Sequence, residues 1–122
     1  MVPPVLKERD NELVKVIRVN TRQVTVSLYD NGTIDKDTVS VYLNKKLVVS
    51  NRMLSLTPIV INIELGDDNE TQELVMVAEN LGEIPPNTSL MVVKAGNQQF
   101  EVRITSTEQK NAVVLFKYEK PK

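Results

Sequence analysis

The sequence predicts an all-β domain, built as a two-sheet sandwich of about eight or nine strands. Short runs rich in Val, Ile, Thr and Tyr recur along the chain and are separated by polar turns, as in β-sandwiches. Within many runs apolar and polar residues alternate, as in a strand with one buried face. The pattern fits an immunoglobulin-like sandwich and a jelly-roll equally, because these folds differ in topology rather than in strand chemistry.

Nine runs carry the composition of strands. They are residues 12–19, 23–29, 38–43, 46–49, 59–65, 73–78, 89–94, 100–105 and 112–118. Alternation is clear in the second run, where Val24, Val26 and Leu28 face one side. Two runs, 74–78 and 112–116, are apolar at nearly every position. They are expected to be central strands or to form a surface that meets another domain.

The start of the chain and the shortest turns set the boundaries of the predicted domain. Residues 1–11 are charged and contain prolines, so they are predicted to be a linker or lead-in to one domain over residues 12–120. The charge content of residues 6–16 also suits a short helix, although their apolar spacing is irregular. Asn44-Lys45 and Gly96-Asn97 are predicted to be tight hairpin turns, with glycine available for a positive φ.

Size and charge exclude several classes of function. A chain of 122 residues fits one domain and can bury a core without a disulfide or a metal. Its 15 basic and 16 acidic residues give a net charge of −1, so neither nucleic acid nor an anionic membrane attracts it at long range. No apolar run approaches the ~20 residues that span a bilayer. Nucleic-acid binding and membrane insertion are therefore not expected.

Enzymatic activity is not expected either. The chain has no His and no Cys, which excludes a Ser-His-Asp triad, thiolate chemistry and zinc sites built on sulfur. Two carboxylates alone can hydrolyse glycosides, so a small glycoside hydrolase remains a third alternative. Such enzymes also need a sugar-binding cleft lined with aromatic residues, and three Tyr, two Phe and no Trp are too few to indicate one.

The loop over residues 30–37 is the candidate functional site. Asp30, Asn31, Asp35 and Asp37 place four oxygen-bearing side chains within eight residues, and Ca²⁺ takes six to eight hard oxygen ligands. The spacing departs from the EF-hand pattern, and Lys36 would lie beside the ion. The competing interpretation is a connecting loop whose Asp and Asn side chains hold backbone amides.

Three stretches of the chain resemble one family. They are VSLYDNGTIDKDTVSV (26–41), ELVMVAENLGEIPPNT (73–88) and QKNAVV (109–114). Together they resemble an uncharacterised β-sandwich module of secreted and cell-envelope proteins from Bacteroidetes-type bacteria, over about residues 12 to 118. Similar modules often have Asp-Gly-Asp where this chain has Asp35-Lys36-Asp37, which weakens a metal site inferred by analogy. The resemblance implies an exported, non-catalytic domain attached to other domains.

Two functional hypotheses follow. The first is a non-catalytic accessory module of an exported bacterial protein, secreted or in the cell envelope, that serves adhesion, scaffolding or spacing. The alternative is a Ca²⁺-dependent carbohydrate-binding module that uses the loop 30–37, with Ca²⁺ as its cofactor. The corresponding partners are another envelope protein and a carbohydrate.

Overall fold

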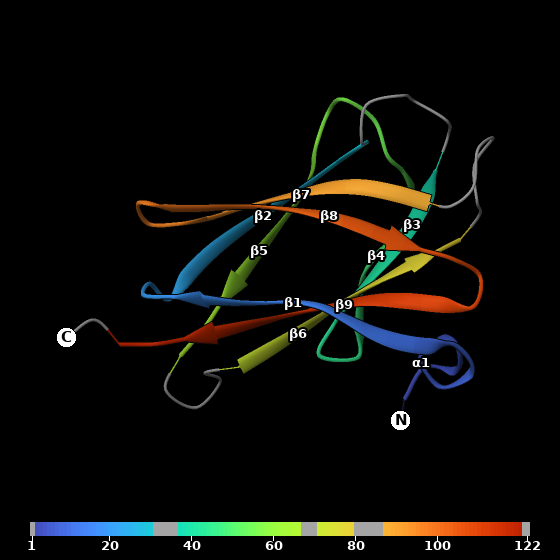
Figure 1. The fold of residues 1–122 in the computed structure, drawn as a ribbon, viewed down its shortest axis with the longest axis horizontal. Coiled ribbons are helices and arrows are strands. Elements are labelled where there is room, and N and C mark those ends of the chain that lie inside the picture. The colour runs from blue at the N-terminus through green and yellow to red at the C-terminus, as the bar shows by residue number, and fades with distance from the viewer. Residues whose placement is uncertain (1, 31–36, 67–70, 80–86, 121–122) are drawn as a thin grey trace.

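The computed structural model describes residues 2–30, 37–66, 71–79 and 87–120. This part of the chain forms a β-sandwich of nine strands and one short helix (Figure 1), which confirms the predicted fold class. In chain order the elements are α1 (Pro4–Glu8), β1 (Asp10–Val19), β2 (Gln23–Asp30), β3 (Thr38–Leu43), β4 (Lys46–Met53), β5 (Ile59–Glu64), β6 (Thr71–Ala78), β7 (Asn87–Ala95), β8 (Gln98–Ser106) and β9 (Lys110–Tyr118).

The strands divide into a five-stranded sheet with the order β1-β9-β6-β3-β4 and a four-stranded sheet with the order β5-β2-β7-β8. Every pair is antiparallel except β1–β9. The parallel pairing of the first and last strands is foreign to the antiparallel Greek keys of a jelly-roll. The smaller sheet contains the hairpin β7–β8 beside the β5–β2 pair.

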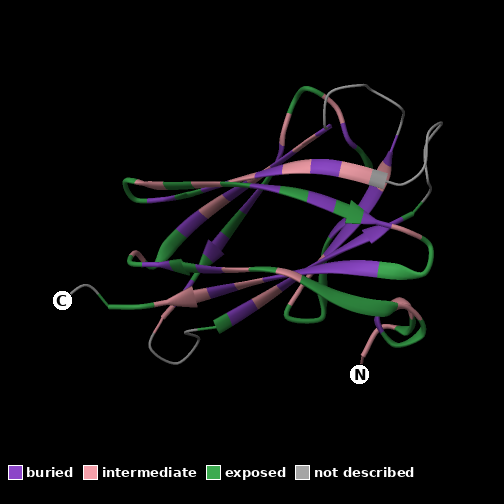
Figure 2. Cartoon of the chain, in the orientation of Figure 1, coloured by how far each residue is buried: buried purple, intermediate pink, exposed green. Residues whose placement is uncertain are grey.

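The core lies between the sheets and follows the alternation in the sequence. In β2 the buried apolar residues are Val24, Val26 and Leu28, and in β5 every second residue is buried. Phe116 of β9 is the largest of the fully buried side chains. Figure 2 shows buried and exposed bands alternating along the strands. Because alternate residues of each strand are apolar and face inward, the two sheets pack together through these side chains.

The two doubly apolar runs became β6 and β9, which are interior strands of the larger sheet, as predicted. Their inward side chains join the core between the sheets. Their outward side chains Val75, Val77 and Val113 form a second cluster with Leu6 of α1. The segment predicted as a lead-in thus contains a helix that covers the outer face of this sheet.

Hydrogen bonds hold the N-terminal segment in place. The Asn111 amide Nδ2 donates to the carbonyl of Val5 at 3.1 Å, and the Arg9 guanidinium donates to the carbonyl of Ala78 at 2.8 Å. Pro4 stands within the first turn of α1, where a missing N–H costs nothing and a fixed φ favours the helix. The helix ends at Glu8 because Arg9 has extended backbone angles.

The hairpin turns have the predicted chemistry. Asn44 and Lys45 both have positive φ, at 52° and 69°, as a type I′ turn requires. Gly96 has a φ of 63°. The fourth predicted strand, 46–49, was too short, since β4 continues to Met53. Two register shifts between β3 and β4 interrupt its alternation, so the period of the strand was not visible in the sequence.

Candidate functional site

The structure describes two of the four predicted metal ligands. Asp30 is the last residue of β2, and Asp37 directly precedes β3. Asn31 and Asp35 lie outside the described residues. The exposed fraction is 5% for Asp30 and 0% for Asp37. Both side chains are therefore part of the folded interior rather than of a solvated loop tip.

Both aspartates lie against the start of β7. Asp30 pairs with Ser89 in the β2–β7 ladder, and the carboxylate Oδ2 of Asp37 accepts a hydrogen bond of 3.1 Å from the backbone N–H of Thr88. Asp37 and Thr88 are far apart in the sequence, and their contact depends on how distant strands pair. The sequence alone therefore did not predict it. The structure thus brings the two ends of the predicted loop to one end of the sandwich.

The crossing from β4 to β5 joins the same two aspartates through their backbones. The N–H of Leu54 donates to the carbonyl of Asp37 at 2.8 Å, and the N–H of Asp30 donates to the carbonyl of Ser55 at 2.9 Å. Leu54 is fully buried. This end of the sandwich is consequently tied together by backbone bonds as well as by the Asp37 carboxylate.

Glu79 is a third carboxylate at this end. Its N–H donates to the carbonyl of Thr38 at 2.9 Å, and its Oε2 accepts a hydrogen bond of 2.8 Å from the hydroxyl of Ser40. The same hydroxyl accepts a bond of 3.0 Å from the N–H of Asn51, the residue of positive φ in β4. Ser40 and Glu79 therefore stabilise the irregular β3–β4 pairing.

The chemistry available at this end follows from these contacts. Carboxylate oxygens are hard ligands suited to Ca²⁺, and buried charges in proteins are paired or hold metals. Within the described residues, no group of three or more Asp, Glu, His or Cys side chains is placed to hold a metal. The Asp37 carboxylate accepts a hydrogen bond from a backbone N–H of β7.

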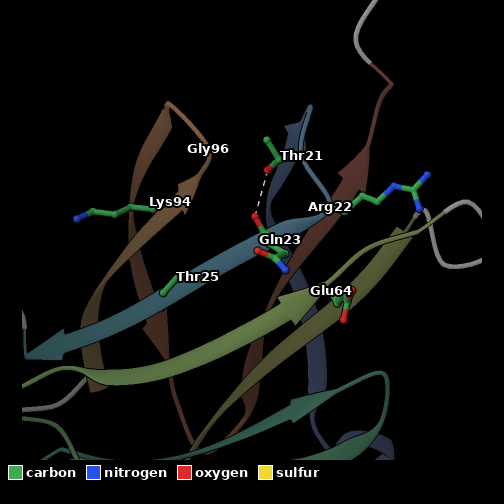
Figure 3. A pocket seen from close by; sticks show the side chains of 7 residues that line it. All are labelled: Thr21, Arg22, Gln23, Thr25, Glu64, Lys94 and Gly96. Carbon is green, nitrogen blue, oxygen red and sulfur yellow. Dashed lines mark hydrogen bonds between the residues drawn. The ribbon is translucent and has the colours of Figure 1, made fainter.

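A pocket lies at the other end of the smaller sheet. It has a volume of about 620 Å³ and lies between the β1–β2 turn, β2, the end of β5 and the β7–β8 turn. Figure 3 shows the residues that line it, which are Thr21, Arg22, Gln23, Thr25, Glu64, Lys94 and Gly96. The two turns meet there, since the N–H of Asn20 donates to Oε1 of Gln98 at 3.1 Å.

The lining of this pocket offers hydrogen-bonding groups but no convergent charges. Arg22 and Lys94 extend away from each other, to opposite sides of the pocket (Figure 3), and Arg22 lies 5.6 Å from the ring centroid of Tyr118. Glu64 is the one carboxylate in the lining. Glycoside hydrolysis needs two carboxylates facing one bond, so this lining lacks the required pair.

Comparisons with known proteins identify no relative. No family model matches the chain, and no curated protein or solved structure matches it. Among the described residues, no helix has the length and apolar character needed to cross a membrane. The fold and the contacts described above therefore carry the functional argument.

Proposed function

We propose that this protein is a non-catalytic β-sandwich accessory module of an exported bacterial protein, serving adhesion, scaffolding or spacing. The observation that carries the proposal is that carboxylates at the candidate site accept hydrogen bonds from groups of the fold itself. Asp37 is fully buried and holds the backbone of β7, and Glu79 holds Ser40. Side chains committed to backbone support are poorly placed to act as general acid or base.

Two further features support this proposal. The absence of His and Cys removes the commonest catalytic side chains. The resemblance of residues 26–41, 73–88 and 109–114 to a module of secreted and cell-envelope proteins supports export and an association with other domains. A compact sandwich with adjacent first and last strands also suits a module inserted in series with others.

Two experiments test this function. Incubation of the purified domain with a panel of polysaccharides should release no reducing ends above a heat-denatured control, and hydrolysis that is lost in an Asp or Glu variant would overturn the non-catalytic assignment. Proteolysis of intact cells that carry the natural parent protein should remove the module from the cell surface. Protection of the module in intact cells, followed by digestion after lysis, would contradict export to the surface.

A Ca²⁺-dependent carbohydrate-binding module is the second candidate. The observation that favours it is the burial of Asp30 and Asp37 at one end of the sandwich, on either side of the polar segment 31–36. Two buried carboxylates that bracket such a segment suit a cation that stabilises the loop or bridges to sugar hydroxyls.

Thermal unfolding distinguishes the two candidates. At about 1 mM CaCl₂, a site with a Kd of ~10 μM would stabilise the fold by ~2.7 kcal/mol relative to EDTA. The Asp30→Asn variant should lose this response to calcium, while Glu101→Gln, at an exposed carboxylate of β8, should keep it. An equal melting temperature in calcium and in EDTA would eliminate the second candidate.

A further inference from the structure

The two sheets end in four edge strands, which differ in how they are protected. β1 and β4 border the larger sheet, and β5 and β8 border the smaller one (Figure 1). An edge strand offers its outward N–H and C=O groups to any further strand. Proteins usually block such pairing with bulges, charged side chains or a covering segment.

Three of the edges carry such protection. β1 has a register shift between Leu13 and Lys15 and is rich in charged residues. β4 has two register shifts, and Asn51 interrupts it with a φ of 49°. β8 exposes Glu101 and Arg103 and lies close to β1 and β9, so the sandwich closes on that side.

β5 lacks all of these features. It pairs with β2 at every position from Ile59 to Glu64 without a shift in register. Its residues are Ile-Val-Ile-Asn-Ile-Glu, so its sole charge stands at the last position. Within the described residues, no segment pairs with its outer side. A straight, β-branched and nearly neutral edge of this kind is a template for strand addition.

Exposed apolar side chains gather in the same stretch of the chain. Of the exposed large hydrophobic residues in the described part of the chain, all but Leu13 belong to β4, the 54–58 crossing or β5. They are Leu47, Val48, Met53, Leu56 and Val60. Val60 is 52% exposed on the outer face of β5 itself. An exposed apolar side chain on an open strand edge adds apolar area to any strand pairing there.

We propose that β5 pairs with β5 of a second copy of the chain, antiparallel and across a two-fold axis. The smaller sheets of the two copies would join into one sheet with the order β8-β7-β2-β5-β5-β2-β7-β8, a size that open sheets commonly reach. This proposal concerns assembly and is independent of whether the module is catalytic or binds calcium.

The charge pattern of β5 favours an identical partner over a foreign strand. A neutral edge offers no charge with which to select an acidic or a basic peptide, whereas a second neutral edge meets it without repulsion. In an antiparallel pair with Asn62 opposite Asn62 of the second copy, outward residues face outward residues, each Glu64 lies opposite Val60, and the two Glu64 residues are about 14 Å apart along the strands. Each Val60 would lie two residues from the axis, beside Glu64 of the other copy, and would lose solvent exposure in both copies.

Sedimentation equilibrium over about a hundredfold range of concentration tests the pairing. The mass of the wild type should rise from 13.8 kDa toward twice that value. Val60→Asp and Asn62→Lys, both at exposed positions of β5, should raise the dimer dissociation constant at least about tenfold, since Val60→Asp faces Glu64 and two copies of Asn62→Lys face each other. Leu13→Lys is the matched control, because Leu13 is 53% exposed on the β1 edge and Val60 is 52% exposed. It should leave the constant unchanged.

Disulfide trapping locates the interface in a chain without native cysteine. Asn62→Cys should form a covalent dimer under mild oxidation, whereas Leu13→Cys should not. A wild type that stays monomeric throughout the concentration range would overturn the proposal. Dimers that persist in both charged β5 variants, or that Leu13→Cys traps in preference to Asn62→Cys, would also overturn it, because they would place the interface elsewhere.

Discussion

On the five-stranded sheet, the outer face of β6 and β9 is apolar and is covered by α1, whereas the outer face of the four-stranded sheet is largely polar and open. On the first face, Val75, Val77 and Val113 are buried beneath Leu6. On the second, Thr25, Asn62 and Lys94 form one row across three strands and stay partly or fully exposed. One sheet thus buries apolar side chains on its outer face, whereas the other presents polar side chains to solvent there.

The difference shows that α1 is a structural part of the fold despite its single turn. A five-residue helix is unstable in isolation, so packing on the sheet must hold it. In return it removes the outward valines of β6 and β9 from water. The face without such a cover carries polar side chains instead, which need no partner.

Substitution of a valine by aspartate on each face should give the largest contrast. Val75→Asp introduces a charge at a position that is 2% exposed and should lower the free energy of unfolding by about 3–5 kcal/mol. Val92→Asp, at a half-buried position on the outer face of β7, should cost about 1 kcal/mol or less. Urea unfolding followed by circular dichroism measures both. Equal losses would mean that the two faces are equally buried in solution.

Removal of the cover alone should have an intermediate effect. Leu6→Ala deletes the buried side chain of α1 and should cost about 2–3 kcal/mol, through lost burial and a cavity above Val75 and Val113. Leu13→Ala, at an exposed position of the neighbouring β1 strand, should change stability by less than about 0.5 kcal/mol. The Leu6 variant should also lose amide protection at Arg9 and Asn11 in hydrogen exchange. A Leu6 variant as stable as the wild type would show that α1 leaves the sheet in solution.

On the open face the sensitive position is a turn rather than a buried side chain. A Cβ on Gly96 would stand 2.7 Å from Cγ2 of Thr21, and its φ of +63° disfavours other residues. Gly96→Ala should therefore cost about 1–2 kcal/mol. Gly66→Ala, with no atom within 4 Å of the added Cβ, should be neutral or slightly stabilising.

A double variant separates the two causes of this loss. Thr21→Ser removes the Cγ2 atom, so in that background Gly96→Ala should keep the backbone strain but lose the collision. Part of the stability should return, as measured by the same urea unfolding. A full loss in both backgrounds would assign the effect to the backbone angle alone.

Most of the strands could be predicted from the sequence because burial on one face imposes alternation. The run Val24-Val26-Leu28 and the β5 isoleucines became buried as expected. Alternation fails where a bulge intervenes, which is why the end of β4 was missed. The covering role of α1 was missed for a related reason, since one turn of helix is too short to show a period.

The candidate site was predictable in composition but not in structure. The sequence alone shows the cluster of Asp and Asn residues, and their oxygen atoms are suitable ligands for calcium. The burial of Asp37 and its bond to Thr88 arise only when β7 lies beside β2. Contacts between strands that are far apart in sequence leave no local signal, so single-sequence analysis cannot supply them.

The parallel ladder between β1 and β9 has a mechanical consequence. Because the two strands run in the same direction, from Asp10↔Lys110 to Val19↔Tyr118, the chain enters at one end of the ladder and leaves at the other (Figure 1). Tension between the two ends then acts along the strands and shears all of the interstrand hydrogen bonds at once, rather than opening them one at a time. Within a series of linked domains under load, this one would resist extension through its first and last strands, and the rate of forced unfolding would depend on that ladder.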